Sequence, residues 1–439
     1  MEKGVIFMKK IFKKLHLIVT KYNHKKFYGF ISGHGYLSNS QLKSIKVLVN
    51  KDNKDATSIF EKKFSNIIGG GECISYAAAR MCFYSLMKVL KIEKGDEIIL
   101  LGSTCSVMAN AVLKIGATPI YSDIDLDTFG SSALSIESCI TKSTKMIVAQ
   151  HSFGIPCSIQ KIVSIAQKND IFLLEDCALT MGSSVNNTVV GNFGDAAIFS
   201  TDHTKPLNTI IGGMLYTRHK ELADTLRIFR DSCQELSYNK KKSLWIRILV
   251  EKQFCNVNKY GKMELVDSLY SIAIKFFSLS TPFLTDDFSS KVINKNYPYP
   301  SKLPNFLAQL GIYEVERWEK YKEDRRSLLN SLIMAVDANA RVKLPAAYYD
   351  ELIYIVPLRF VWSDKDGTLK RRELSNLIDV NWTWFLKPII GTNERLENFG
   401  YKTNSCPVSE SAGKNMVNIP CNFDKSEYKE FLKKLKLIL

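Results

Sequence analysis

The sequence lacks the cysteine spacing that marks metal-binding and disulfide-exchange motifs. Its 439 residues include ten cysteines, and no two of them form a C-x-x-C pair. Most of these cysteines lie within apolar runs, so we expect buried, reduced thiols and no metal site. Thiols of this kind are typical of a reducing compartment, and we therefore expect a cytoplasmic location.

Long apolar runs are also missing, and none approaches the roughly 18 residues that a membrane-spanning helix needs. Residues 1–28 hold eight lysines and one acid, without the clean apolar stretch and small-residue cleavage site of a signal peptide. Within them, Phe7, Ile11, Leu15 and Ile18 recur at helical spacing. Two interpretations stay open: a surface helix packed on the body, or an amphipathic helix in peripheral contact with an anionic membrane surface.

Internal repeats, low-complexity tracts and nucleic-acid-binding modules are absent, although the formal net charge is +16. A basic surface attracts nucleic acid, anionic lipid or phosphorylated substrates, and charge alone does not separate them. Because no module supports binding to DNA or RNA, we expect no nucleic-acid partner. The length exceeds one ordinary core, and a hydrophobic content of 46% suffices for about two to three globular domains.

Short apolar runs alternate with helical patterns between residues 73 and 232. This alternation predicts a mostly parallel sheet covered by helices on both faces. In such sheets, ligands bind beyond the carboxyl ends of the strands. The expected strands are Glu97–Leu101, Thr118–Ser122, Met146–Gln150, Ile171–Leu174, Ala196–Ser200 and Gly213–Thr217, and the helices between them include Met81–Leu90, Val107–Ile115 and Ile159–Gln167.

Changes in composition divide the chain into four parts. We predict a basic N-terminal extension over residues 1–40, a large domain over 41–232, a helical bridging region over 233–300 and a small C-terminal α/β domain over 301–439. The small domain is expected to contain a long helix at Leu307–Leu332, a strand near Tyr354–Phe360 and a final helix at Glu427–Leu439.

Three features of the large domain place polar groups at one edge of the predicted sheet. One apolar strand ends in Asp176, another ends in Ser200 with Lys205 five residues later, and a helix starts at Ala79-Arg80. Taken singly, each has an ordinary explanation: an N-capping acid, a solvated lysine and a common alanine-rich helix start. A lysine, an acid and a helix N-terminus together are what pyridoxal 5′-phosphate requires, because it needs an amine for its aldehyde, a carboxylate for its ring nitrogen and donors for its phosphate.

The ordered motifs of the chain resemble the DegT/StrS family of sugar aminotransferases, over about residues 65 to 435. The resemblance implies the fold of type I pyridoxal-phosphate-dependent transferases, with a large domain and a smaller C-terminal α/β domain. The matching stretches are Lys94-Gly95-Asp96-Glu97-Ile98-Ile99, Ala109-Asn110-Ala111-Val112, Gly116-Ala117-Thr118-Pro119, His151-Ser152-Phe153-Gly154-Ile155-Pro156, Glu175-Asp176-Cys177-Ala178, Gly194-Asp195-Ala196-Ala197-Ile198-Phe199-Ser200, Lys205, Gly212-Gly213-Met214-Leu215, Cys406-Pro407-Val408-Ser409-Glu410 and Asn418-Ile419-Pro420.

The resemblance implies a role for each matching residue. Lys205 corresponds to the Schiff-base lysine and Asp176 to the partner of the pyridinium nitrogen. Ser200 corresponds to a phosphate-binding serine, and Ala79 and Arg80 to a pair whose backbone meets the phosphate. His151 corresponds to a histidine beneath the cofactor, where direct contact and a structural hydrogen bond behind Asp176 are both open.

Several positions depart from the family pattern. Leu179 stands where the family usually has a glutamine near the ring hydroxyl, and Cys105 stands where many members stack an aromatic residue on the ring. Ala79 replaces the more frequent glycine. Pro300-Ser301-Lys302 replaces an Asn-Tyr-Arg stretch that often reaches the partner subunit's site. These differences indicate a divergent branch.

The implied activity is amination of a nucleotide-linked keto-sugar, with glutamate as amino donor, for cell-surface polysaccharide or related glycan biosynthesis. The resemblance also implies a homodimer with active sites at the subunit boundary. Two alternatives remain. Some relatives are sugar dehydratases in which histidine replaces the lysine, and a non-catalytic protein of this fold would bind nucleotide-sugars without chemistry.

Overall fold

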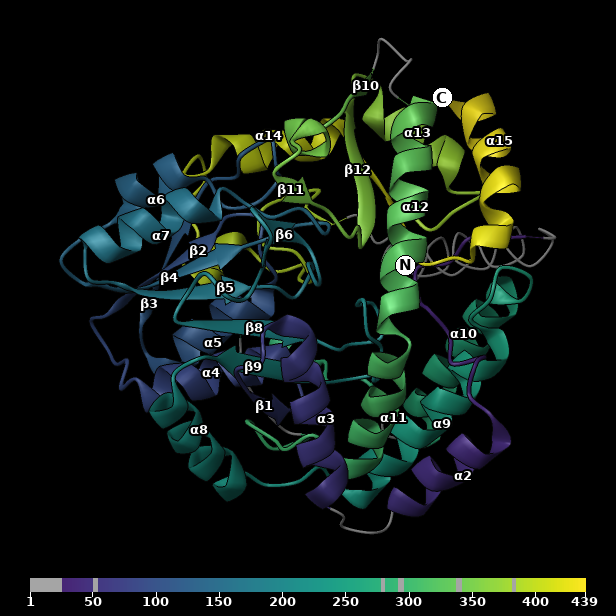
Figure 1. Cartoon of the computed structure of the whole chain (residues 1–439), viewed down its shortest axis with the longest axis horizontal. Helices are drawn as coiled ribbons and strands as arrows, with labels where there is room; N and C mark the ends of the chain where they lie inside the picture. The colour runs from purple at the N-terminus through teal and green to yellow at the C-terminus, as the bar shows by residue number, and fades with distance from the viewer. Residues whose placement is uncertain (1–25, 50–53, 278–280, 291–295, 337–341, 381–383) are drawn as a thin grey trace, which may run out of the picture.

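The computed structural model describes residues 26–49, 54–277, 281–290, 296–336, 342–380 and 384–439. Its centre is a seven-stranded sheet with strand order β1-β9-β8-β5-β4-β2-β3 (Figure 1). All strands run parallel except β9, which is antiparallel to both of its neighbours. The strands are β1 (Glu72–Tyr76), β2 (Glu97–Leu101), β3 (Thr118–Ser122), β4 (Thr144–Gln150), β5 (Phe172–Asp176), β8 (Ala196–Ser200) and β9 (Gly213–Thr217).

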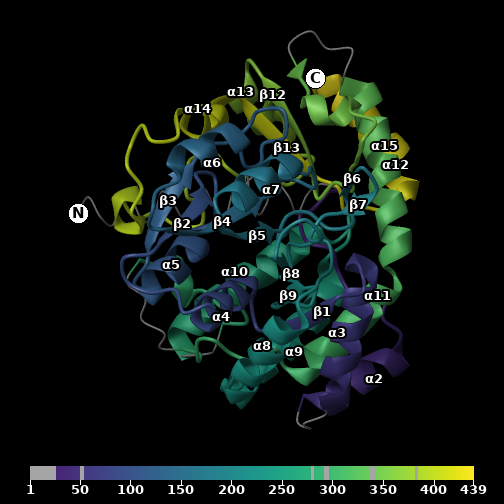
Figure 2. The same ribbon diagram turned by 60° about the vertical axis from the view of Figure 1, so that its left-hand side comes forward.

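Helices cover both faces of this sheet, which confirms the predicted α/β class (Figures 1 and 2). Apolar side chains of α6 and α7 form one core with Ile99 and Ile147 of the sheet. The opposite face packs against α4, α5 and α8 in a larger cluster. These helices are α4 (Ala79–Val89), α5 (Ser106–Ile115), α6 (Ala133–Cys139), α7 (Ile159–Lys168) and α8 (Lys220–Ser232).

The edge strand β1 is the strand of this sheet that the sequence pattern did not predict. Its Ser75 is buried, and both the backbone N–H and the hydroxyl of Ser75 donate to Glu61 Oε1 at 2.7 Å. Glu61 belongs to α3 (Lys54–Ile68), which packs on β1. Ser75 interrupts a short apolar run, so the run does not look like a buried strand in the sequence. The hydrogen-bond acceptor that allows Ser75 to be buried lies on another element, α3.

The small domain holds a three-stranded antiparallel sheet with α12, α13 and α15 packed beside it (Figure 1). It contains β10 (Val342–Lys343), β12 (Arg359–Asp364) and β13 (Met416–Pro420). The helices are α12 (Trp318–Val336), α13 (Gly367–Leu374), α14 (Pro407–Asn415) and α15 (Tyr428–Ile438). The expected final helix is therefore present.

Two expected elements of the small domain are divided in the structure. The predicted helix Leu307–Leu332 is two helices, α11 (Asn305–Glu316) and α12, which meet at Arg317, and the guanidinium of Arg317 lies 3.6 Å from the Tyr36 ring centroid. The predicted strand near Tyr354–Phe360 is also divided. Its first part, β11 (Ile353–Tyr354), pairs with β6 (Ser184–Val185) of the large domain, and β12 starts beyond Pro357.

The segment before the large domain and the bridging region lie together. Phe27 N–H donates to the carbonyl of Val257, and Tyr28 N–H donates to the carbonyl of Leu377 in the small domain. The bridging region is helical, with α9 (Tyr238–Phe254), α10 (Tyr260–Phe277) and the short η1 (Asp286–Phe288), while α2 (Asn39–Leu48) packs on α11. The four-part division of the chain stays a prediction.

The predicted basic amphipathic stretch at Phe7–Ile18 lies outside the described residues. Of the helices that the structure describes, none is both long and apolar enough to cross a membrane. All ten cysteines are described, and all are free.

Candidate active site

The polar groups predicted for the sheet edge come together through strand register. Asp176 is the last residue of β5 and Ser200 the last residue of β8, and these two strands pair in parallel. Because β9 returns antiparallel to β8, their connection needs no crossover helix, and residues 201–212 stay over the edge of the sheet. Lys205 lies within this loop, where its N–H donates to the carbonyl of Asp202 at 2.9 Å.

Lys205 is an interior lysine, and only 8% of its surface is exposed. Burial lowers the pKa of its amine, while the nearby Asp202, Cys105 and Asp176 oppose this shift. A lysine in this environment is neutral over a wider pH range than a surface lysine, and a neutral amine is the nucleophilic form. Its Nζ lies 4.4 Å from the ring centroid of Trp384, a residue of the small domain.

Asp176 is buried beside Lys205. Burial raises the pKa of its carboxyl, but the N–H of Ala178, which donates to Oδ1 at 2.9 Å, and the charge of Lys205 oppose this rise. The N–H of Ala178 and the side chain of Lys205 thus both favour the charged form of the Asp176 carboxylate. A buried carboxylate of this kind suits a cationic ring nitrogen as a partner.

Two helices begin beside this site without a capping side chain. The N-cap of α4 is Ala78 and the N-cap of α5 is Cys105, and neither side chain accepts a hydrogen bond from its helix. At the start of α4, the first backbone N–H groups are available to an anion, whereas at the start of α5 the N–H of Ser106 donates to the carbonyl of Ile390. β9 approaches α4 so closely that a Cβ on Gly213 would lie 2.2 Å from the nitrogen of Ala79. Ser200, half-buried, adds a hydroxyl at the same edge.

The side chain of Arg80 points away from any phosphate that α4 would bind. Its Nε donates to Asp287 Oδ2 at 2.6 Å, and its Nη2 donates to the carbonyl of Leu284 at 2.8 Å. Arg80 therefore ties the start of α4 to η1 of the bridging region. The side chain of Arg80 is therefore committed to this segment, and contact of the Ala79 and Arg80 backbone with a phosphate stays a prediction.

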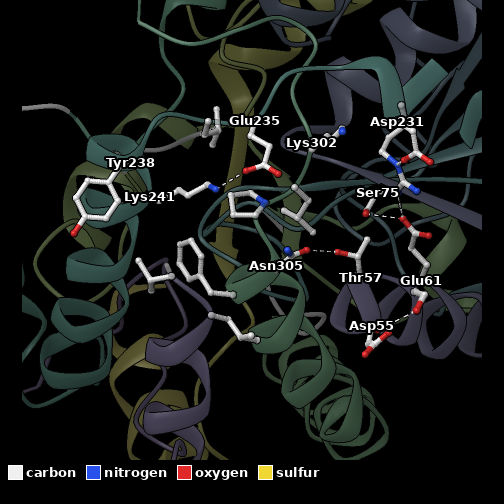
Figure 3. Close-up of a pocket in the computed structure, with 18 residues that line it drawn as sticks. Asp55, Thr57, Glu61, Ser75, Asp231, Glu235, Tyr238, Lys241, Lys302 and Asn305 are labelled. Carbon is white, nitrogen blue, oxygen red and sulfur yellow. Dashed lines mark hydrogen bonds and ion pairs between the residues drawn. The ribbon is translucent and has the colours of Figure 1, made fainter. Parts of the chain in front are cut away.

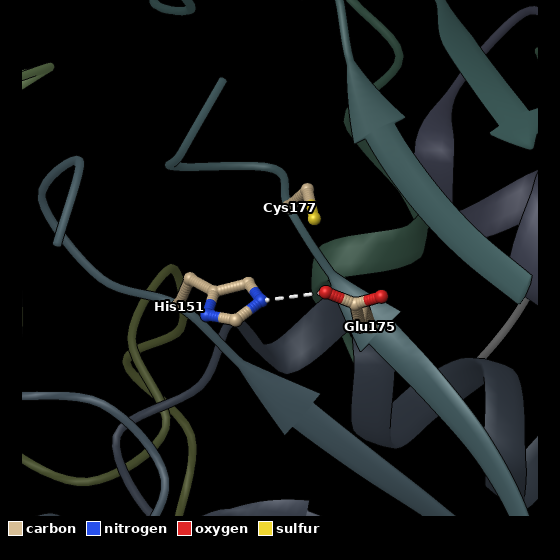
Figure 4. A group of neighbouring side chains, drawn as sticks. All are labelled: His151, Glu175 and Cys177. Carbon is tan, nitrogen blue, oxygen red and sulfur yellow. Dashed lines mark hydrogen bonds and ion pairs between the residues drawn. The ribbon is translucent and has the colours of Figure 1, made fainter. Parts of the chain in front are cut away.

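His151 lies in a buried group with Glu175 and Cys177 (Figure 4). The N–H of Cys157 donates to its Nδ1 at 3.0 Å, so Nδ1 keeps a lone pair and Nε2 carries the hydrogen that faces Glu175 Oε2 at 3.1 Å. Both ring nitrogens are thus used within the protein. This favours the structural interpretation of His151 over direct contact with a cofactor.

Glu175 is the acceptor at the centre of this group. Besides His151, its carboxylate accepts from the N–H groups of Gly191, Phe193 and Gly194 at 2.7 to 2.8 Å. Four donors fill the usual acceptor positions of a carboxylate. The three neighbouring side chains therefore form a hydrogen-bonded support behind the site, and the role of Glu175 was not predicted from the sequence.

The two departures from the family pattern have different surroundings. Leu179 is buried in the hydrophobic cluster that includes Phe153 and Phe385, so this position offers apolar contact instead of an amide. Cys105 stays close to the site, and burial raises the pKa of its thiol while the charges of Lys205 and Arg80 oppose the rise.

The loop that carries Lys205 is held by distant elements through Asn208. The N–H of Asn208 donates to Glu314 Oε2 of α11 at 3.0 Å, and its side-chain amide donates to Glu251 Oε2 of α9 at 2.8 Å. The carbonyl of Asn208 lies 2.9 Å from the His34 ring nitrogen Nε2. The lysine loop thus has supports in the bridging region, in the last turn of α11 and in the N-terminal segment.

A pocket of about 560 Å³ lies elsewhere, between α3, the end of α8 and the start of α11 (Figure 3). Its wall includes Glu61, Arg230 and Lys302, but none of the predicted site residues. Lys302 belongs to the stretch that departs from the family's Asn-Tyr-Arg pattern.

Solved structures with this fold cover nearly the whole chain. The aminotransferase from Psychrobacter cryohalolentis matches with a TM-score of 0.69 and 17% identity, over 92% of this chain and 97% of that chain. The Escherichia coli GDP-4-keto-6-deoxy-D-mannose-3-dehydratase matches with a TM-score of 0.68 and 18% identity, over 95% of this chain and 100% of that chain. The protein therefore has the predicted fold of type I pyridoxal-phosphate-dependent transferases.

Sequence comparison points to one family. Residues 47–258 match the sequence model of the DegT/DnrJ/EryC1/StrS aminotransferase family, so the similarity to this family extends over just under half of the chain. It is 35% identical over 169 residues to the spore coat polysaccharide biosynthesis protein SpsC of Bacillus subtilis, covering 38% of this chain and 43% of that protein. It is also 35% identical over 173 residues to the GDP-perosamine synthase of Escherichia coli O157:H7, covering 38% and 48%. The chain spans about half the length of these curated relatives.

Proposed function

We propose that this protein is a pyridoxal-phosphate-dependent aminotransferase that converts a nucleotide-linked keto-sugar into an amino-sugar. The observation that carries the proposal is the buried amine of Lys205 beside Asp176 at the carboxyl edge of the sheet. The chemistry of the surrounding groups fits the cofactor, because the uncapped start of α4, a hydroxyl, a carboxylate and an amine meet there. When bound, pyridoxal phosphate supplies an electron sink for cleavage of a bond at the amino carbon.

In this proposal, Lys205 holds the cofactor through Nζ. Once released, its amine would carry the proton between the amino-bearing carbon of the substrate and the aldehyde-derived carbon of the cofactor. Its lowered pKa suits this work, because a lower pKa increases the neutral fraction of the amine, and the neutral amine is the form that accepts a proton. Asp176 holds the proton of the ring nitrogen. The backbone at Ala79 and Arg80, together with Ser200, binds the phosphate.

The substrate class rests on the named relatives. They include a GDP-perosamine synthase, a UDP-N-acetyl-3-dehydro-alpha-D-glucosamine 3-aminotransferase and a dTDP-3-amino-3,6-dideoxy-alpha-D-galactopyranose transaminase, at 33 to 35% identity. We propose glutamate as the donor, glycan biosynthesis as the purpose, a homodimer as the assembly and the cytoplasm as the location. The nucleotides of these relatives differ, so the nucleotide and the sugar are left to experiment.

The test is the absorption spectrum of the purified protein with added pyridoxal phosphate, before and after glutamate. We expect a yellow protein whose visible band falls as the cofactor takes the amino group and 2-oxoglutarate appears in equal amount. GDP-, UDP- and dTDP-linked keto-sugars are then added in turn, and the true substrate restores the band. A protein that takes up no cofactor would refute the proposal.

The same measurement separates the two alternatives. A dehydratase would release ammonia or a keto acid without forming an amino-sugar, and Lys205 argues against it because those relatives have histidine there. A non-catalytic protein would bind the nucleotide-sugar while its spectrum stays unchanged by glutamate. Leu179, which cannot hydrogen-bond, is the observation that keeps this second alternative in view.

The pH dependence of cofactor capture tests the environment of Lys205. An ordinary lysine has a pKa of 10.5, and burial lowers that of Lys205, so between its own pKa and 10.5 Lys205 is neutral while a free lysine is protonated. The rate at which the apo-protein captures pyridoxal phosphate should therefore rise with pH, and the midpoint pH of this rise should lie below that of Nα-acetyl-lysine under the same conditions. Asp202→Asn should lower the midpoint further, because the Asp202 carboxylate favours the charged amine. A midpoint equal to that of the free amine would contradict the expectation.

A further inference from the structure

We infer that Trp384 supplies the aromatic surface for the cofactor ring, in place of the aromatic residue that is missing at Cys105. The inference rests on the proposed binding of pyridoxal phosphate at Lys205, and it does not depend on which sugar is aminated. Trp384 comes from the small domain, 179 positions after the lysine. It was not among the residues predicted from the sequence.

The first support is the position of the indole. The ring centroid of Trp384 lies 4.4 Å from Nζ of Lys205, the atom through which the cofactor would be attached. A Schiff base would join the cofactor ring to this nitrogen through a single carbon, so the ring would start two bonds from Nζ and lie within reach of the indole. Aromatic rings that pack in proteins have centroids about 4.5 to 7 Å apart.

The second support is the way in which the segment after Trp384 is held. Ile390 N–H donates to the carbonyl of Thr104 at 2.8 Å, and Ser106 N–H donates to the carbonyl of Ile390 at 2.9 Å. The segment that follows the indole therefore flanks residue 105 on both sides. It is fixed to the position whose side chain many family members stack on the cofactor.

The third support is the side chain of Cys105, which faces the segment that follows Trp384. A Cβ on Gly391 would lie 3.4 Å from Cys105 Sγ, an ordinary contact distance, and 2.8 Å from the Phe288 ring. The position that lacks the family's aromatic residue and the segment that carries Trp384 are therefore neighbours.

The fourth support is an unused hydrogen-bond donor. Nε1 of Trp384 is buried and has no hydrogen-bond partner within the part of the chain that the structure describes. Indole N–H groups usually find a partner when they are buried. An oxygen of the bound cofactor or substrate at this place would accept the hydrogen bond.

The test compares Trp384→Ala, Trp384→Phe and the wild type in their affinity for pyridoxal phosphate, by absorbance titration of the apo-proteins. We expect the alanine variant to bind about tenfold more weakly, since a ring contact contributes up to about a factor of ten. The phenylalanine variant keeps a ring and should stay within about threefold of the wild type. Trp245→Phe, a half-buried tryptophan on α9, is the matched control and should bind like the wild type.

A second readout follows indole fluorescence during the same titration. Cofactor close to Trp384 should quench part of the wild-type emission, and this part should be missing in Trp384→Phe but present in Trp245→Phe. Circular dichroism checks that each variant is folded, and Trp384→Phe keeps the test valid where the alanine variant is not. Equal or tighter binding by a folded Trp384→Ala would overturn the inference, because the indole would then be irrelevant to the ring or would occupy its place. A wild type that binds no cofactor would instead refute the proposed function.

Discussion

Lys205→Ala is expected to remove the visible absorption of the protein and to reduce amino transfer by at least about 100-fold, because one change removes both the attachment point of the cofactor and the group that moves the proton. The measurements are the absorption spectrum with added cofactor and the rate of 2-oxoglutarate formation from glutamate.

Two further variants separate chemistry from charge at this position. Lys205→Arg keeps a cation beside Asp176 but has no amine that attaches the cofactor, so it should be as inactive as the alanine variant. Lys220→Ala removes a lysine from the exposed start of α8 and should leave colour and rate unchanged. Retention of the visible band and of the rate in Lys205→Ala would show that another residue performs the reaction.

Glu175→Gln is expected to lower the free energy of unfolding by about 3 kcal/mol, because it breaks the most heavily used acceptor behind the site. In the native protein this carboxylate faces only donors, namely His151 Nε2 and the N–H groups of Gly191, Phe193 and Gly194. An amide keeps one acceptor oxygen, and its NH₂ group would point at two other donors. Urea titration of the apo-protein measures the change.

Glu137→Gln is the control for Glu175→Gln. Glu137 carries an exposed ion pair with Lys168 at 3.5 Å, and exposed pairs of this kind stabilise proteins by no more than about 1 kcal/mol. A loss below about 1 kcal/mol in Glu175→Gln would contradict the proposed role of this carboxylate. Reduced stability with normal affinity for pyridoxal phosphate would show that Glu175 supports the site without touching the cofactor.

The local pattern of apolar and polar residues was sufficient to predict most strands of the large domain. The strands β2, β3, β8 and β9 begin and end where the apolar runs predicted. Parallel strands buried on both faces have continuous apolar sequences, which differ clearly from the helices between them. β1 was missed because the hydrogen bonds that allow the polar Ser75 to be buried are made to Glu61 of helix α3, which the sequence of the strand does not reveal. The break at Arg317 was missed because no glycine or proline lies between Ile312 and Leu332 to mark it in the sequence.

The candidate site divides in the same way. Asp176, Ser200 and Lys205 could be predicted because each follows a strand end and the topology brings those ends together. Trp384 could not be predicted, because only the docking of the small domain brings it to Lys205. For His151, the sequence left two interpretations open. The choice between them depends on the N–H of Cys157, whose position a sequence motif does not give.

The support of the lysine loop by Asn208 has a consequence for dissecting this protein. The recognisable stretch, residues 47–258, contains Lys205 and Asp176, and it would be the natural fragment to express alone. Two of the groups that hold Asn208, His34 and Glu314, lie outside that stretch. A fragment cut at these boundaries would keep Lys205, Asp176 and Ser200, but it would lose His34 and Glu314, which help to hold the lysine loop. The remainder of the chain is therefore a structural component of the candidate site, and exchanging it between relatives would alter the support of the lysine loop.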